Sequence, residues 1–141
     1  YMRAKHLKKP VISICRGSQF ICVMNGGKLV QHQENPSFLH NIQTYDGRTL
    51  EVTSTHHQAA FPYNLPKENY ELIGWSENLS RFHLDGNNEE MNPPYEAEVV
   101  YYPKSNDLGI QSHPEMYNNK EVHVYFNNLI KEKLLCKKQS R

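Results

Sequence analysis

The fold of this chain is decided by the stretch KPVISICRGSQFICVM, which covers Lys9–Met24. Its first half is an apolar run after a proline and predicts a buried strand over residues 10–14. Its second half has apolar residues at helical spacing and predicts a short helix over residues 16–24, ended by the glycine pair that follows. Cys15 stands at the junction, where a direct strand-to-helix turn pushes the central side chain into the open above a sheet.

Cys15 therefore stands where a nucleophile would be placed. The unpaired amides of a helix N-terminus favour a thiolate, so we expect its pKa to lie below the roughly 8.5 of a free cysteine. The alternative is a small buried hydrophobic residue, because free cysteine is among the most buried residue types. The other cysteines are Cys22, which we expect to be structural, and Cys136. An odd, widely spaced set predicts no disulfide framework and favours a reducing compartment, so we expect a cytoplasmic protein.

A candidate general base lies in the stretch GIQSHPE, residues 109–115. Here a second apolar strand, predicted over residues 108–112, ends in His113. The proline that follows biases this histidine toward an extended conformation, and Glu115 can turn back toward the ring. In a Cys-His-Glu relay the histidine takes the thiol proton and later gives it to the leaving group, while the carboxylate orients the imidazole. Cys15, His113 and Glu115 are thus the candidate catalytic residues.

Three stretches make the sequence recognisable, namely ICRGSQ at residues 14–19, STHHQAA at residues 54–60 and GIQSHPE at residues 109–115. In this order they resemble three signature blocks of class I glutamine amidotransferases, and they are most similar to those of the γ-glutamyl hydrolase-like peptidase branch. The resemblance implies that Cys15 attacks a γ-carboxamide. Ammonia or an amine then leaves, and water hydrolyses the γ-glutamyl thioester.

The same resemblance implies a pocket for glutamine or another γ-glutamyl amide. The amide of Arg16 would supply one oxyanion donor. The residues implied in substrate binding are Arg16, Gly17, Gln19, Ser54, His56, His57 and Gln58. We expect no cofactor and no metal, because the two adjacent histidines of this set would point to opposite sides of an extended chain and no metal-ligand spacing is present.

Two positions depart from the family pattern. Ser13 stands where glycine is usual, and we expect strain there if the turn requires a positive φ. Ser112 replaces a bulky aromatic residue before the His-Pro pair, which leaves less apolar packing around the base. Both departures predict reduced activity rather than a lost reacting group.

The expected fold class is α/β. The resemblance implies a three-layer, flavodoxin-like amidotransferase domain with a mostly parallel sheet, helices on both faces and an antiparallel extension around residues 95–112. Only fourteen residues precede Cys15, whereas several β/α units precede the nucleophile in the family. We therefore expect residues 1–141 to be the C-terminal portion of one domain. Its N-terminal units would be absent, processed away or carried by another chain.

Other elements follow from local patterns. An amphipathic helix over residues 118–135 is expected to be capped by Asn118. Residues 34–45 give no clear pattern, and residues 77–94 are expected to form an irregular excursion, a lid or a contact surface. Further extended segments are expected over residues 28–33, 49–54, 70–76 and 95–102, and the end of a helix over residues 1–9.

Composition leaves three classes of function open. A net charge of +1 gives no electrostatic case for nucleic acid, and no run approaches the roughly 18 apolar residues of a membrane span. The first class is a glutaminase subunit that passes ammonia to a synthetase partner. The second is a free-standing γ-glutamyl peptidase. The third is a non-catalytic relative that binds or regulates.

Overall fold

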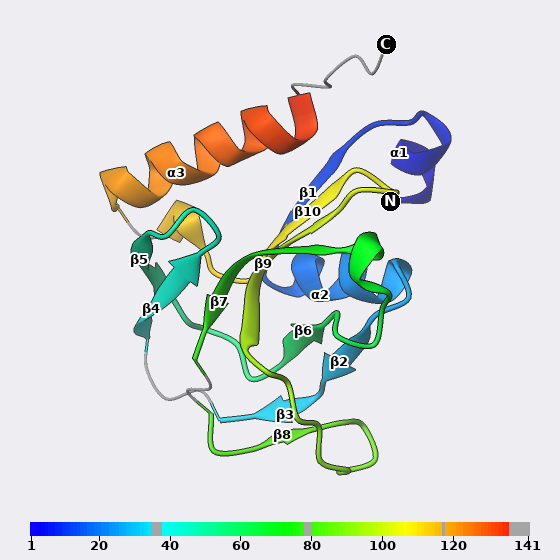
Figure 1. Cartoon of the computed structure of the whole chain (residues 1–141), viewed down its shortest axis with the longest axis vertical. Coiled ribbons are helices and arrows are strands. Elements are labelled where there is room, and N and C mark those ends of the chain that lie inside the picture. Colours follow the sequence, from blue (N-terminus) through cyan, green and yellow to red (C-terminus); the bar gives the residue numbers. More distant parts are fainter. Residues whose placement is uncertain (35–37, 78–79, 117, 136–141) are drawn as a thin grey trace.

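The computed structural model of the chain describes residues 1–34, 38–77, 80–116 and 118–135. Its main body is a six-stranded sheet with the strand order β1-β10-β9-β7-β4-β5 (Figure 1). The strands of this sheet are β1 (Val11–Ile14), β4 (Leu39–Thr44), β5 (Thr49–Thr53), β7 (Glu71–Ser76), β9 (Glu96–Tyr102) and β10 (Asp107–Ile110).

Two small sheets accompany the main one. Strand β2 (Lys28–Val30) pairs with β6 (Ala59–Phe61), and β3 (His32–Gln33) pairs with β8 (His83–Leu84). The sequence patterns did not predict β6 or β8, and β8 lies within the segment expected to be irregular. These strands are only two or three residues long, so neither shows a period, and each depends on a distant partner. Parts of residues 34–45 and 77–94 lie outside the described residues.

The expectation of a mostly parallel sheet is wrong. Only β1 and β10 pair in parallel, and every other pairing within the described part of the sheet is antiparallel. The connections explain this, because a parallel pair requires a crossover of a dozen or more residues. Strands β4 and β5 are joined by a tight turn at residues 45–48, in which Gly47 has a φ of +83°. Residues 103–106 join β9 to β10 equally tightly, which confirms the expected antiparallel extension.

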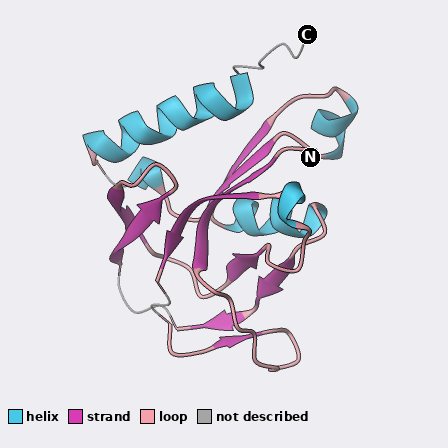
Figure 2. Cartoon of the chain, in the orientation of Figure 1, coloured by secondary structure: helices cyan, strands magenta, loops and turns pink. Residues whose placement is uncertain are grey.

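Helices lie on both faces of the sheet, as expected (Figure 2). The helices are α1 (Met2–His6), α2 (Arg16–Met24) and α3 (Lys120–Ile130), with short 3-10 turns at Lys67–Asn69 and Pro114–Met116 and a π turn at Lys131–Leu135. Helix α3 is capped by Asn119 rather than by Asn118, since the Asn119 side chain accepts hydrogen bonds from two backbone N–H groups of the first turn. Within the described residues, no helix has the length and apolar character that crossing a bilayer requires.

Two hydrophobic cores hold these layers together. On one face α3 packs on the sheet, with Phe126 and Leu129 buried against strand residues such as Val99. On the other face α2 contributes Ile21 and Cys22, and both are almost completely buried. Cys22 is therefore structural, as expected.

Gly109 sets how closely α2 lies on β10. A Cβ at this position would lie 2.5 Å from the Ser18 hydroxyl and 3.3 Å from the Cδ1 atom of Ile21. We expect Gly109→Ala to lower the free energy of unfolding by about 1–3 kcal/mol, because overpacking forces the helix away from the strand. Urea unfolding measures this loss. The control is Gly86→Ala, where the nearest atom is 3.7 Å away on Gln31. Equal losses in the two variants would contradict this packing.

Candidate active site

Cys15 occupies a strained turn between β1 and α2. Its φ is +51° and its ψ is −111°, and it is the N-cap residue of α2. A positive φ at a residue other than glycine costs of order 1–3 kcal/mol and is concentrated at functional sites. The strain falls on Cys15 and not on Ser13, which lies in regular strand β1. Gly17 makes room for the serine, because a Cβ at Gly17 would lie 3.0 Å from the Ser13 Cβ.

The thiol of Cys15 is not activated by the helix N-terminus alone. Partial burial raises its pKa above the ordinary value, and the negative charges of Glu115 and Glu98 act in the same direction. A hydrogen bond from the Arg16 N–H favours the thiolate but does not offset these effects. The expectation of a lowered pKa is therefore wrong. A thiol of this kind is protonated at neutral pH and needs a base to become a nucleophile.

His113 and Glu115 form a hydrogen-bonded pair directly after β10. The Nδ1 atom of His113 lies 2.7 Å from the Oε1 atom of Glu115. Because a carboxylate only accepts, Nδ1 carries the proton and Nε2 is left to accept one. Slight burial opposes ionisation of Glu115, but the hydrogen bond from His113 holds the pKa of this carboxyl below its usual range. This is the arrangement that a general base and its orienting carboxylate require.

The backbone of His113 is fixed by neighbouring elements. Its N–H donates to the Thr53 hydroxyl at 2.8 Å, which joins the end of β10 to the end of β5. The carbonyl of Pro114 lies 2.8 Å from the Nε2 atom of His123 on α3. The imidazole is thus carried by a segment anchored on two sides.

Strands β1 and β10 end at the same edge of the sheet. Their parallel register places Ile14 beside Ile110, and the N–H of Cys15 donates to the Ile110 carbonyl at 2.7 Å. The sequence predicted that both strands would end in one sheet, and this is confirmed. Cys15 and His113 therefore leave neighbouring strands at the carboxyl edge, where α/β enzymes place their sites.

Three glutamines connect the three sequence blocks beneath this edge. The side-chain amide of Gln19 donates to the Gln58 carbonyl at 2.8 Å and to the Oε1 atom of Gln111 at 3.3 Å. The Gln111 amide in turn donates to the Cys15 sulfur at 3.8 Å. Gln19 and Gln111 are almost fully buried. We call Gln19, Gln58 and Gln111 the polar bed of the site.

The second sequence block forms one wall beside the polar bed. Ser54 is buried, and its N–H donates to the Phe38 carbonyl at 2.6 Å. His56 is also buried, with its Nδ1 atom 2.9 Å from the Gln58 carbonyl. His57 is exposed, and the Gln58 amide donates to the Gln31 side chain at 2.7 Å. Arg16 is exposed at the start of α2. The side chains of Gln19, His56 and Gln58 are thus engaged within the protein.

Sequence reasoning missed Glu98 and His40. Glu98 is only 2% exposed, and its Oε1 atom lies 3.0 Å from His40 Nε2 and 4.0 Å from His56 Nε2. Two glutamates within the otherwise apolar strand over residues 95–102 were the available signal, since a buried charge is rarely tolerated without a partner. His40 lies in a segment whose pattern gave no element.

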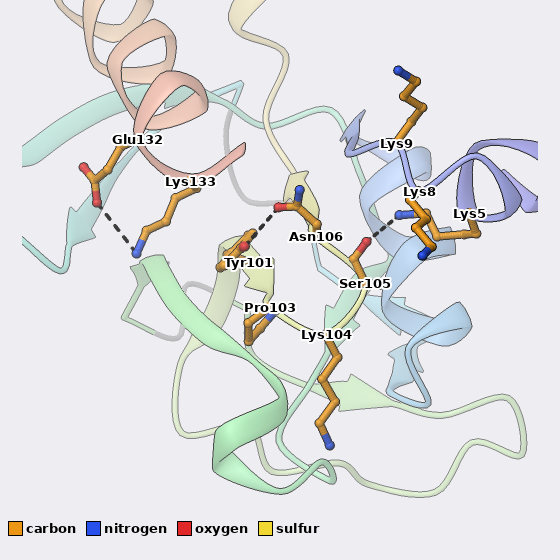
Figure 3. Close-up of a pocket in the computed structure, with 10 residues that line it drawn as sticks. All are labelled: Lys5, Lys8, Lys9, Tyr101, Pro103, Lys104, Ser105, Asn106, Glu132 and Lys133. Carbon is orange, nitrogen blue, oxygen red and sulfur yellow. Dashed lines mark hydrogen bonds and ion pairs between the residues drawn. The ribbon is translucent and has the colours of Figure 1, made fainter. Parts of the chain in front are cut away.

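A pocket of about 860 Å³ lies at the opposite end of β1 and β10 (Figure 3). Lysines gather around it, but it includes none of the predicted site residues. Lys5 is engaged with the buried Asp107, and Lys133 with Glu71. In Figure 3 the exposed side chains of Lys9 and Lys104 extend in opposite directions. This pocket is therefore separate from the candidate active site.

Comparison with known families assigns the first part of the chain. Residues 1–60, which carry Cys15 and the second sequence block, match the family Peptidase C26. Over these residues the chain is similar to the peptidase C26 family. This match confirms the resemblance to class I glutamine amidotransferase-like proteins of the γ-glutamyl hydrolase branch. Comparison with curated proteins gives no match.

Solved structures support the fold of this peptidase C26-like chain. It resembles a protein from Thermoplasma acidophilum that is assigned as one of the subunits of a GMP synthase, with 18% identity and a TM-score of 0.60, covering 86% of this chain and 55% of that one. It also resembles a glutamine amidotransferase from Thermotoga maritima, with 17% identity and a TM-score of 0.57, covering 99% of this chain and 54% of that one. The chain thus spans about half the length of these structures, and at such identities the likeness concerns the fold alone.

Proposed function

We propose that the protein is a cysteine-dependent hydrolase of γ-glutamyl amides. The observation that carries this proposal is the strained Cys15 turn, placed beside the strand that continues into the hydrogen-bonded His113–Glu115 pair. The peptidase C26 match over residues 1–60 supports it independently. We also propose a cytoplasmic location, because a thiol nucleophile stays free in a reducing compartment.

The proposed mechanism uses one thiol and one imidazole. His113 Nε2 takes the proton of Cys15 as the sulfur attacks the γ-carbonyl carbon, and the Arg16 N–H binds the resulting oxyanion. The imidazolium then protonates the leaving nitrogen as the C–N bond breaks, which leaves a γ-glutamyl thioester. Water activated by His113 hydrolyses the thioester to glutamate and restores the thiol. Glu115 keeps His113 in the required tautomer throughout.

The substrate-binding roles are proposals of the same kind. Arg16 and Gly17 would contribute backbone N–H groups at the start of α2, where negative charge is favoured. Exposed His57 would face the α-amino and α-carboxylate groups of the substrate, and buried Ser54 would line the pocket on the same segment. Gln19, His56 and Gln58 are better suited to holding the wall of the pocket, because their side chains have protein partners.

The test is glutamate release from two substrates. The protein alone is incubated with glutamine and with a series of γ-glutamyl amines, and each assay is repeated with a candidate synthetase. Cleavage of γ-glutamyl amines without a partner supports a free-standing peptidase, whereas release that requires the synthetase supports a glutaminase subunit. No release from either substrate, with a correctly folded protein, would favour a binding or regulatory domain.

The exposed edge of the main sheet beside the site is suited to pairing with an additional chain segment. Among the described strands, β1 pairs with β10 alone and forms the edge of the main sheet. Ile12 on this strand is 43% exposed, and Phe20 and Val23 on α2 are 49% and 46% exposed. An edge strand beside exposed apolar side chains is a site for further pairing. We propose that a β/α unit of an N-terminal segment or partner subunit covers this edge and supplies the second oxyanion donor.

Glu115→Gln should reduce kcat by about 10- to 100-fold with little change in KM. The amide can donate to Nδ1 and so favour the wrong tautomer of His113, while the shape of the side chain is kept. Steady-state kinetics with a γ-glutamyl amine measures the effect. Glu121→Gln is the matched control, because this glutamate is an exposed residue of α3. An unchanged kcat in Glu115→Gln would exclude the orienting role.

A further inference from the structure

Glu98 lies directly behind the candidate active site. Its backbone carbonyl accepts a hydrogen bond from the Gln111 N–H at 2.7 Å, and Ile110 accepts one from the Cys15 N–H. Cys15 and Glu98 are therefore two strand spacings apart at the same edge of the sheet, with roughly 10 Å between their backbones. Only 2% of the Glu98 surface is exposed.

Two histidines face the Glu98 carboxylate. His40 Nε2 lies 3.0 Å from Oε1, and His56 Nε2 lies 4.0 Å from the same oxygen. Because His56 Nδ1 lies 2.9 Å from the Gln58 carbonyl, it donates its proton there, and Nε2 of the same ring is left facing the Glu98 carboxylate. Among the described residues, neither His56 Nε2 nor Glu98 Oε2 has a hydrogen-bond partner.

Such an arrangement is a poor way to stabilise a fold. Apolar residues of similar volume often replace a buried ion pair without loss of stability, and each unpaired buried polar atom is unfavourable. Buried charges beside a reactive group are instead a mark of functional sites. Glu98 also connects to the polar bed twice, through the Gln111 backbone and through the His56–Gln58 contact.

We propose that Glu98 is a positioning residue of the active site, which supports the polar bed beneath Cys15 through His56 and the Gln111 backbone and whose charge limits the reactivity of the thiol. This inference rests on the proposed role of Cys15 as the nucleophile. It does not depend on the substrate or on turnover, so it can be tested by alkylation of the thiol.

The charged groups around Cys15 and Glu98 determine how the reactivity of the thiol should depend on pH. Glu115 and Arg16 also act on Cys15. His40 and His56 face Glu98, and the charge of Glu96 acts on His40. Burial opposes ionisation of His40, but its hydrogen bond to Glu98 raises the His40 pKa above the ordinary value. While His40 is protonated, its positive charge offsets the negative charge of the Glu98 carboxylate. As pH rises through the raised His40 pKa, the carboxylate is left uncompensated, so its effect on the thiol should grow.

The experiment compares Glu98→Gln with Glu96→Gln. Glu96 is a matched control because it lies on the same strand, is 5% exposed and pairs with His83 at 2.8 Å. Alkylation of Cys15 by iodoacetamide is followed between about pH 6 and pH 10 by mass spectrometry of the peptide that carries it. We expect Glu98→Gln to accelerate alkylation by about two- to tenfold at alkaline pH and to lower the pH midpoint of the alkylation rate, since one negative charge two strands away is removed. Glu96→Gln should leave the profile unchanged.

Unfolding measurements on the two variants separate an effect on the active site from a general loss of stability. Comparable losses of stability with a shifted profile only in Glu98→Gln support the proposal. Identical alkylation profiles in wild type and both variants would overturn it. If Glu98→Gln does not fold, the coupling between Cys15 and the Glu98 cluster can be tested in the wild-type protein by recording the ¹⁵N NMR signals of its imidazole rings. Blocking Cys15 with iodoacetamide should then shift the signals of His40 and His56 but not those of His83, and unchanged His40 and His56 signals would overturn the proposal.

Discussion

Cys15→Ser is expected to reduce glutamate release by about 10³-fold or more, the scale seen when a nucleophile is removed from a catalytic triad. The hydroxyl fills the same space, so the strained turn and its hydrogen bond to the Ile110 carbonyl remain. The site would lose only the sulfur, whose proton His113 can remove far more readily than that of a serine. Steady-state assays with glutamine and with a γ-glutamyl amine measure the loss.

The matched control is Cys22→Ser. Cys22 lies seven residues further along α2, is completely buried and faces the Lys28 carbonyl at 3.5 Å. This variant should change stability while leaving kcat per folded molecule close to that of the wild type. A Cys15→Ser protein that retains more than a tenth of the activity would show that another group performs the attack.

His113→Gln should lower kcat by about 10²- to 10⁴-fold near neutral pH. Burial and the nearby carboxylates raise the pKa of the Cys15 thiol, so without a base the sulfur stays protonated. The loss should become smaller as pH rises, because hydroxide then forms the thiolate in place of His113. Profiles of kcat against pH for the wild type and His113→Gln measure how the loss changes with pH.

The control for this variant is His32→Gln, on the small β3 strand and exposed to solvent. Its activity should match that of the wild type at every pH. A His113→Gln profile parallel to that of the wild type would indicate that the histidine supports the structure and does not transfer the proton.

Local patterns predicted the elements on which the candidate site depends. The apolar run before Cys15 and the spacing after it are local properties, and β1 and α2 appear at the expected residues. The direct strand-to-helix junction likewise predicted the turn, and the positive φ of Cys15 shows its strain. The His113–Glu115 contact was predictable because both residues flank one proline.

The parts that failed depend on partners distant in sequence. Sheet direction was taken from the family resemblance, although the short turns at residues 45–48 and 103–106 require antiparallel pairs. The raised pKa of Cys15 follows from burial and from the charges of Glu115 and Glu98, and Glu98 lies 83 positions further along the chain. The contact between His40 and Glu98 joins β4 to β9, and no local pattern encodes it.

The central claim is that Cys15 and His113 act on one γ-glutamyl group together. A glutamine analogue with a chloromethyl ketone in place of the carboxamide tests it most directly, because labelling requires both a bound substrate group and a deprotonated sulfur. Peptide mass spectrometry should find the label on Cys15 in the wild type, blocked by excess glutamine, and strongly reduced in His113→Gln at neutral pH. Labelling that is equal in the two proteins, or that falls on another residue, would contradict the account.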